Sequence, residues 1–301
     1  MSELTERIIE DIERVDTSDD TSEGESESES VAESLTSFEQ LPNAIKRRVF
    51  ALKKLQFQKN AINEAFLQDF LELQKSYESK FEPLFEKRRQ IVSGEYEPLD
   101  SDLPDGQSLD ADPNECKGIA GFWLKVLLSS PMAKHISLPD EPILKHLTDI
   151  KVAVNPEERM YSFAFHFSPN DYFTNEVLKK DIYFSMNTMS VDPMHARKCQ
   201  STPIHWNEGK DVTVEHRIYD SRHKQERLSV YKNSFFRYFW STQNEPLEET
   251  EELHLKYEWN LSQHLVEALV PNAVLFFTGE MSLNSDQNLY EEEEEYEFVN
   301  Q

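Results

Sequence analysis

Cysteine is scarce in this sequence, since only Cys116 and Cys199 occur among its 301 residues. Two cysteines are too few for a disulfide framework, and free thiols are typical of proteins in a reducing compartment. No apolar run reaches the ~18 residues that a transmembrane helix needs. The opening residues also lack the cationic and apolar regions of a secretory signal. We therefore expect a protein of the cytosol or nucleus without a membrane segment.

Sequence motifs for catalysis and cofactor binding are missing as well. The chain has only seven glycines and no glycine-rich phosphate loop, and it lacks the HExxH, nucleophile-elbow and paired CxxC patterns. Paired carboxylates are too abundant for an acid–base pair to be chosen from spacing. His195 and Cys199 could place two zinc ligands on one helix face, but no second pair lies nearby. We expect no enzyme activity, no cofactor and no metal.

Basic residues are also few relative to acidic ones. Lysine and arginine number 31 against 57 acidic residues, a formal net charge of −26. Such a surface repels nucleic-acid phosphates and anionic lipids, so neither sequence-specific nucleic-acid binding nor membrane binding is expected. A densely basic partner is favoured instead, because long-range attraction speeds its encounter with the acidic surface.

The two ends of the chain carry most of this charge. Residues 1–35 hold 13 acidic side chains against two arginines, and residues 286–301 hold seven against none. With few apolar residues to offset the entropy of ordering, we expect both segments to be disordered. They are interpreted either as binding arms or as solubilising tails. The C-terminal segment contains an unbroken acidic run, made of Glu291, Glu292, Glu293, Glu294 and Glu295.

Three serines near the N-terminus match a kinase pattern. Ser22, Ser26 and Ser30 are each followed three residues later by glutamate, a spacing that acidic-directed kinases of the casein-kinase-II type accept. Each phosphate would add about −1.5 to −2 charges. A serine- and glutamate-rich tract also matches this pattern by chance, so both interpretations stay open.

A long helix is predicted within residues 36–97. No glycine occurs from Pro42 to Val92, and Ser93-Gly94 follows as a stop, which gives a helix of about fifty residues and roughly 75 Å. Pro83 is expected to kink the helix or to end it early, near Ser79. Apolar residues recur along it in an eleven-residue repeat, at Ile62, Phe66, Phe70, Leu73, Tyr77, Phe81 and Leu84.

This apolar stripe needs a second helix to cover it. The simplest source is another copy of the chain, so we expect a homodimer, either parallel or antiparallel. The alternative is a partner helix in the same chain, but no other segment matches the stripe in length.

An α+β domain is expected over residues 118–285, after an acidic connector at residues 98–117. Helical spacing occurs at 120–129, 234–240 and 253–269, and Pro271 opens a last short helix that ends at Gly279. Alternating apolar residues predict an antiparallel sheet of at least four strands, with strands at 150–154, 160–167, 181–189, 211–219 and 226–231. A further acidic run, Glu248, Glu249, Glu251 and Glu252, is interpreted as a helix N-terminus or as a binding surface.

Seven separated segments, in order between Lys46 and Glu280, resemble those of one protein family. They are YESKFEPLFEKRRQIVSGEYEP, GIAGFWLKVLLSSP, DEPILKHLTDIKV, FAFHFSPNDYFTN, PIHW, SFFRYF and VPNAVLFFTGE. Together they resemble the nucleosome assembly protein family of histone chaperones.

The resemblance implies a long dimerisation helix followed by an α+β histone-binding domain. It also implies an ATP-independent chaperone that binds core histones, as histone dimers, shields them from non-specific DNA contacts and promotes nucleosome assembly. Nucleus and cytoplasm are both implied as locations. Candidate histone contacts are Asp140, Glu141 and Asp149, the run Glu248 to Glu252, and the acidic tail.

Two transport signals and one alternative function also follow from the resemblance. Leu67, Phe70, Leu71 and Leu73 resemble an export signal, but the same residues suit helix packing. The basic hairpin around Arg217, Arg222, Lys224 and Arg227 lies where relatives carry an import signal, and here Asp220 and Glu226 interrupt it. The alternative function is a dimeric acidic scaffold or phosphatase inhibitor, as in the related SET-type branch.

Overall fold

The structure is a computed structural model that describes residues 38, 41–104, 117–187, 193–221, 224–243 and 246–281. The expected acidic segments and the three candidate phosphorylation serines therefore lie outside the described residues. The chain divides into two compact units, Met1–Leu55 and Gln56–Gln301. Within the first unit, Phe38 packs edge-to-face on Phe50 at 5.4 Å between ring centroids, and the Lys53 ammonium lies 5.3 Å from the Phe38 ring centroid.

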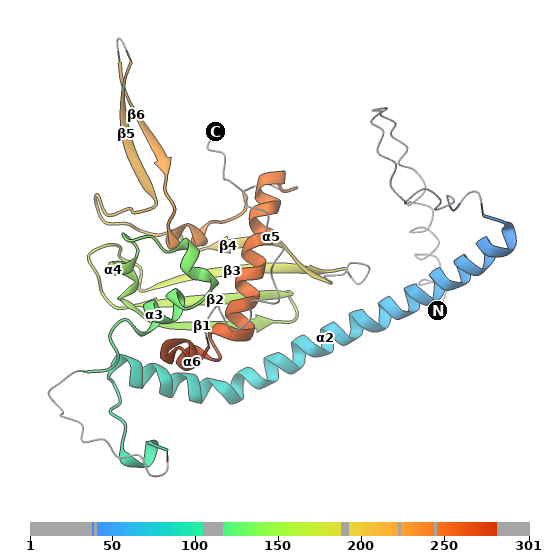
Figure 1. The fold of residues 1–301 in the computed structure, drawn as a ribbon, viewed down its shortest axis with the longest axis horizontal. Helices are drawn as coiled ribbons and strands as arrows, with labels where there is room; N and C mark the ends of the chain where they lie inside the picture. Colours follow the sequence, from blue (N-terminus) through green and yellow to red (C-terminus); the bar gives the residue numbers. More distant parts are fainter. Residues whose placement is uncertain are drawn as a thin grey trace. The chain divides into compact units, whose positions relative to one another are not determined.

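The predicted long helix is confirmed as α2, Asn43–Ser93, with 51 residues (Figure 1). The expected early end near Ser79 is wrong, because α2 continues through Pro83. Proline removes one backbone hydrogen bond, but contacts with the sheet domain hold the helix on both sides of it. Glu78 accepts a hydrogen bond from the Val154 backbone N–H, and the Glu86 carboxylate lies 3.7 Å from the Lys151 ammonium.

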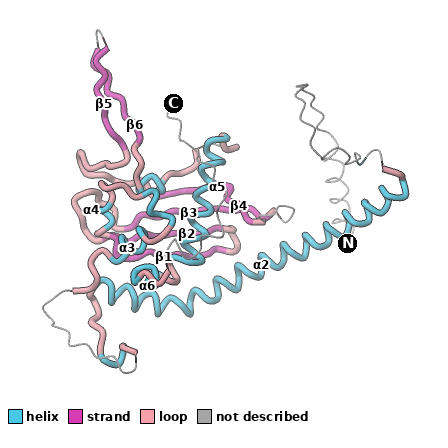
Figure 2. Tube along the Cα trace, viewed as in Figure 1, coloured by secondary structure: helices cyan, strands magenta, loops and turns pink. Residues whose placement is uncertain are grey.

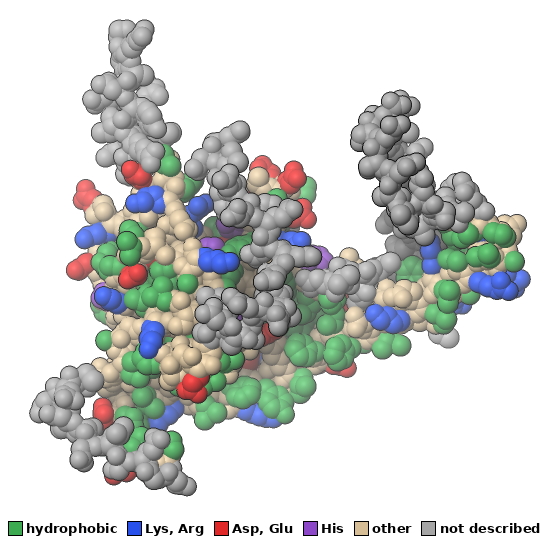
Figure 3. Space-filling view, viewed as in Figure 1, with side chains coloured by type: hydrophobic (Ala, Val, Ile, Leu, Met, Phe, Trp, Pro, Cys, Tyr) green, Lys and Arg blue, Asp and Glu red, His purple; other side chains and the backbone are tan. Residues whose placement is uncertain are grey.

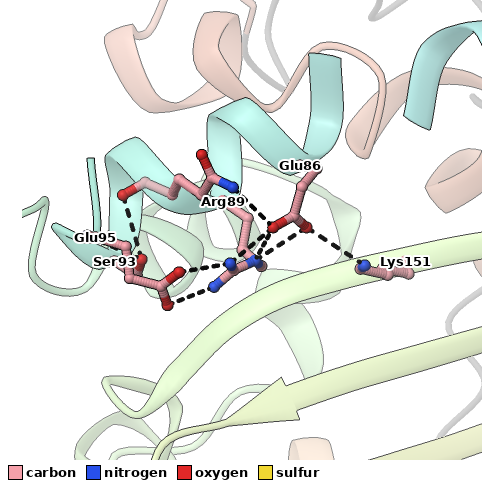
Figure 4. Close-up of polar contacts among 6 residues, drawn as sticks. Glu86, Arg89, Ser93, Glu95 and Lys151 are labelled. Atoms are coloured by element: carbon pink, nitrogen blue, oxygen red, sulfur yellow. Dashed lines mark hydrogen bonds and ion pairs between the residues drawn. The ribbon is translucent and has the colours of Figure 1, made fainter. Parts of the chain in front are cut away.

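A charged cluster fixes the last turns of α2, as Figure 4 shows. The Arg89 guanidinium lies 2.7 Å from the Glu86 carboxylate and 2.6 Å from that of Glu95. Hydrogen bonding from Arg89 lowers the pKa of Glu86 to about 2. Because Glu86 also faces Lys151 of the first strand, the cluster ties the end of α2 to the sheet.

Gly94 ends α2 at a point where the chain later returns. Its φ of 76° is left-handed, which glycine adopts without strain. A Cβ on Gly94 would lie 2.7 Å from the backbone nitrogen of Gly118, and the Ile119 N–H donates to the Val92 carbonyl. The connector thus leaves and re-enters the domain at one place, which only glycine on both sides permits.

The predicted antiparallel sheet is confirmed as four strands in the order β1-β2-β3-β4, followed by a separate hairpin, β5-β6 (Figure 2). The observed strands are β1 Leu147–Asn155, β2 Met160–Phe167, β3 Val177–Met186, β4 Met194–Ser201, β5 Val214–Ser221 and β6 Lys224–Tyr231. Strand β4 was not predicted, because its sequence MHARKCQS has no apolar alternation. Side chains of 216–228 lie outside the description.

Helices cover one face of the sheet (Figure 1). The helices after the connector are α3 Phe122–Leu128, α4 Glu141–Leu144, α5 Glu249–His264 and α6 Ala273–Thr278, with a 3-10 helix, η4, at Phe235–Phe239. The covered face carries the alternating aromatic residues of β2, and Phe165 packs edge-to-face on Phe239 of η4 at 5.2 Å. Phe184 of β3 packs on Trp259 of α5 at 5.3 Å. The fold class is therefore α+β, as predicted.

Candidate functional site

The apolar stripe of α2 is open to solvent in the single chain. Its exposed fractions run from 44% for Phe70 and Tyr77 to 72% for Ile62, and Phe66, Leu73, Phe81 and Leu84 fall between them. Figure 3 shows hydrophobic side chains along this helix. Exposed apolar patches of this extent are uncommon on monomeric proteins and mark interaction surfaces.

A different face of α2 packs on the chain's own sheet domain. Leu67 and Leu71 are buried there, and the Tyr161 hydroxyl of β2 donates to the Gln74 side chain at 3.0 Å. The residues that resemble an export signal are therefore divided between two roles. Leu67 and Leu71 belong to the core, whereas Phe70 and Leu73 belong to the exposed stripe.

Asp140 does not lie on the surface that the resemblance implied. It is fully buried, and its carboxylate accepts four hydrogen bonds. The donors are the backbone N–H and hydroxyl of Ser137 at 2.7 and 2.8 Å, the Ser234 hydroxyl at 2.6 Å and the Phe235 N–H at 3.0 Å. These bonds tie the start of α4 to the start of η4, so Asp140 is a structural residue and not a candidate contact.

Asp149 is also buried, with 1% of its surface exposed. Burial raises the pKa of its carboxyl group, and the charge of Arg88 opposes that shift. Arg88 itself donates to the Val270 carbonyl, and its guanidinium lies 5.1 Å from the Trp123 ring centroid. Burial lowers the pKa of Arg88 in turn. Asp149 therefore lies buried on β1, within the electrostatic influence of Arg88 of α2, and is not exposed to a partner.

The remaining described carboxylates keep their candidate status. Glu141 is half-buried at the start of α4, and Glu248, Glu249 and Glu252 are exposed in or beside the first turn of α5. Glu251 is half-buried and accepts hydrogen bonds from the backbone N–H groups of Gln243 at 2.9 Å and Glu248 at 3.3 Å. Glu251 thus supports the helix N-terminus, and Glu291 to Glu295 lie outside the described residues.

The proposed helical pairing of His195 and Cys199 is wrong, because both residues lie on strand β4. In a strand, a spacing of four residues corresponds to about 13 Å, and here only Cys199 is buried. Its thiol donates to the Trp240 carbonyl at 3.6 Å, and burial raises its pKa to about 11. The described residues contain no group of three or more histidine, cysteine or acidic side chains that could hold a metal ion.

Two further expectations concern transport and membranes. The predicted hairpin is present as β5-β6, but the side chains of its basic residues lie outside the description. Among the described segments, no helix is long and apolar enough to cross a bilayer.

Sequence comparison identifies relatives over most of the chain. The family model described as Nucleosome assembly protein (NAP) matches residues 47–280. Nucleosome assembly protein 1-like 4 of Homo sapiens is 33% identical over 296 positions, covering 85% of this chain and 79% of the relative. Nucleosome assembly protein 1-like 1 of Xenopus tropicalis is 35% identical over 298 positions, covering 85% and 74%.

Solved structures share the fold. Nucleosome Assembly Protein 1 from Plasmodium knowlesi superposes with a TM-score of 0.53 at 23% identity, covering 80% of this chain and 100% of that one. The crystal structure of Ccp1 has a TM-score of 0.50 at 23% identity, covering 77% and 96%. The matched segment of the family model includes both the exposed stripe of α2 and the whole four-stranded sheet. This chain therefore belongs to the nucleosome assembly protein family.

Proposed function

We propose that the protein is a histone chaperone that binds core histones, presented as histone dimers, and promotes nucleosome assembly without ATP. One observation carries the proposal: the segment that matches the family model holds an exposed apolar stripe and an exposed acidic helix start. The whole chain has a net charge of −26. Relatives whose names contain nucleosome assembly protein support the same role.

The stripe is proposed to form a homodimer. Each of its seven members loses contact with water when a second helix covers it, and a buried leucine or phenylalanine contributes about 1.5–3 kcal/mol. A dimer also doubles the number of acidic surfaces on one particle, which raises avidity when a partner engages both.

The acidic surface is proposed to compete with DNA. Free histones adhere to DNA through non-specific, salt-dependent phosphate contacts. Carboxylates that cover the same basic side chains remove those contacts, so a histone is released to DNA only where its placement there is favourable. Charge alone gives a fast encounter with little selectivity, so the folded domain is assigned the selective contacts and the terminal acidic segments the encounter.

Nucleus and cytoplasm are proposed as the sites of action. Nucleosome assembly relatives support the nucleus.

A titration with DNA competition tests the proposal. Labelled core-histone dimers bound to random-sequence DNA are titrated with the full chain at near-physiological salt and without ATP. We expect histone to leave the DNA and to enter a complex with the protein. If histone stays on the DNA at saturating protein, the proposal is overturned. A parallel titration with residues 36–285 assigns the activity to the folded part or to the acidic ends.

A further inference from the structure

A groove of about 460 Å³ opens between η4, the base of the β5-β6 hairpin and the start of α5. None of its residues is an expected histone contact except Glu251. Its lining comes from the segments PIHW and SFFRYF, from Trp240, from Tyr231 at the base of the hairpin, and from Thr250, Glu251 and His254 of α5. Two of the segments that carry the family resemblance, PIHW and SFFRYF, thus meet at one concave surface.

Aromatic rings form the floor of the groove. Phe236 and Phe239 are buried, and Trp206 packs edge-to-face on Phe236 at 5.3 Å between ring centroids. Trp240 packs edge-to-face on His254 of α5 at 4.6 Å. Because these rings are held by their neighbours, the floor is preorganised and gives up little conformational entropy when an apolar side chain covers it.

The two walls of the groove differ in charge. On the hairpin side, the exposed Arg237 lies over the Tyr231 ring at 5.3 Å, and its guanidinium has five N–H donors suited to peptide carbonyls. On the α5 side, Thr250 and Glu251 line the groove, and Glu248, Glu249 and Glu252 are exposed in or beside the same turn. An aromatic floor between an arginine donor and a wall with one carboxylate, beside three more exposed carboxylates of the same helix turn, matches a peptide with both apolar and cationic side chains.

We propose that this groove binds an extended basic segment of a histone. One apolar side chain of that segment covers the aromatic floor, its carbonyl oxygens accept from Arg237, and a flanking lysine or arginine lies against the carboxylates at the start of α5. This inference rests on the proposed function and adds to it a selective contact that surface charge by itself does not supply.

Charge complementarity favours a basic segment as the ligand of this groove. The start of α5 carries four carboxylates, Glu248, Glu249, Glu251 and Glu252, which repel the chain's own acidic ends and attract lysine and arginine. A purely apolar ligand would leave this wall unused. A basic segment without an apolar residue would leave the aromatic floor unused.

The test uses the full chain and a short lysine-rich synthetic peptide with one central leucine. Thr250→Arg introduces a bulky cation at an exposed groove position, and Asn260→Arg introduces the same charge at an exposed position of α5 that does not line the groove. Binding is followed by tryptophan fluorescence, since Trp206 and Trp240 line the groove while Trp123 and Trp259 are buried. Tyr231→Ala removes an exposed ring from the hairpin-side wall.

We expect Thr250→Arg and Tyr231→Ala each to weaken peptide binding at least about tenfold, in the range of an interface anchor, while Asn260→Arg binds like the unmodified protein. Replacing the central leucine by serine is expected to weaken binding to a similar degree. Equal affinity of Thr250→Arg and the unmodified chain overturns the proposal, as does equal affinity for the leucine and serine peptides.

A core-histone titration with the same proteins separates this proposal from the proposed function. If the unmodified chain binds no core histones, the proposed function fails. If it binds them and Thr250→Arg binds them with the same affinity, the groove proposal fails and the function stands.

Discussion

Lys180 of β3 and Glu258 of α5 form an ion pair in which both side chains are buried. The Lys180 ammonium also donates to the Tyr238 carbonyl of η4, and the Glu258 carboxylate accepts from His254 Nε2 at 3.2 Å. One cationic side chain thus connects the sheet, η4 and the helix layer. Removing one partner leaves the other charge buried without compensation.

Replacement of one member of this pair is therefore expected to destabilise the fold. Lys180→Met and Glu258→Gln should each lower the free energy of unfolding by about 3–5 kcal/mol, measured by urea denaturation. The double variant Lys180→Met/Glu258→Leu should recover much of that loss, because two apolar side chains leave no charge buried. If the double variant loses as much unfolding free energy as the single variants, Lys180 and Glu258 do not form the proposed stabilising pair.

Charge in the middle of the α2 stripe is expected to separate the proposed dimer. Leu73 is 58% exposed in the single chain, and Leu73→Glu would bring two carboxylates into a dimer interface while removing two apolar contacts. We expect the dissociation constant to rise at least about 100-fold, since each 1.4 kcal/mol is a factor of ten. Sedimentation equilibrium measures it. Ala61→Glu, on an exposed position outside the stripe, is the matched control and should remain dimeric.

Asp140 is expected to act on stability alone. Asp140→Ala leaves the backbone N–H groups of Ser137 and Phe235 without their acceptor, and a cost of about 3–5 kcal/mol follows from several lost bonds to a charged acceptor. Urea denaturation checks this. At temperatures where the variant is fully folded, its histone affinity should equal that of the unmodified chain, whereas a selective loss of affinity would restore Asp140 as a contact.

The exposed carboxylates at the start of α5 are expected to act on binding. Glu248→Gln/Glu249→Gln/Glu252→Gln keeps the size of each side chain and leaves Glu251 in place to support the helix. We expect a slower association rate with core histones and a weaker dependence of that rate on salt, with little change in unfolding free energy. Stopped-flow mixing at several salt concentrations measures both. An unchanged association rate would show that these carboxylates do not take part in the encounter with histones.

Glu86 is expected to make part of the stability pH-dependent. Arg89 holds the folded-state pKa of Glu86 at about 2, below its ordinary value, so the stabilisation is complete at neutral pH and is lost as pH falls from about 4.5 toward 2. Glu86→Gln should therefore reduce stability at pH 7 more than at pH 3, by a small amount because the side chain is partly exposed. Urea denaturation at both pH values checks this, with Glu82→Gln, an exposed carboxylate of the same helix, as the control. If the loss of stability caused by Glu86→Gln is larger at pH 3 than at pH 7, the predicted direction of the pKa shift is wrong.

Local periodicity was enough to place most elements. The strand at 160–167 was predicted with its observed bounds, because Tyr161, Phe163, Phe165 and Phe167 alternate strictly and all four are buried. The outer limits of the long helix were predicted within about one residue, because Pro42 and Gly94 bound a stretch without glycine, whereas the early end expected from Pro83 is absent. Strand β4 could not be predicted from periodicity, because its residues are mostly polar. It is held in place by pairing with β3.

The burial and the partners of individual polar residues could not be predicted from the sequence. Asp140 and Asp149 belong to an acidic chain, so a surface position was the natural expectation, yet both are buried. Lys180 follows the inward-facing Leu178 on β3, but nothing next to it in sequence indicates that Glu258 lies opposite. The groove was not predicted for the same reason. Its segments PIHW and SFFRYF are about thirty residues apart and meet only in the folded domain.

Composition alone gives the net charge, and local spacing gives the helix and strand periods and the apolar stripe, because a period depends on residues that are close together in the chain. Which face of α2 the domain covers, which carboxylates remain in water and which aromatic rings share a groove follow only from the folded domain. Those outcomes depend on which distant segments bury a given side chain, and burial determines whether a charged group is a structural partner or a surface offered to another molecule.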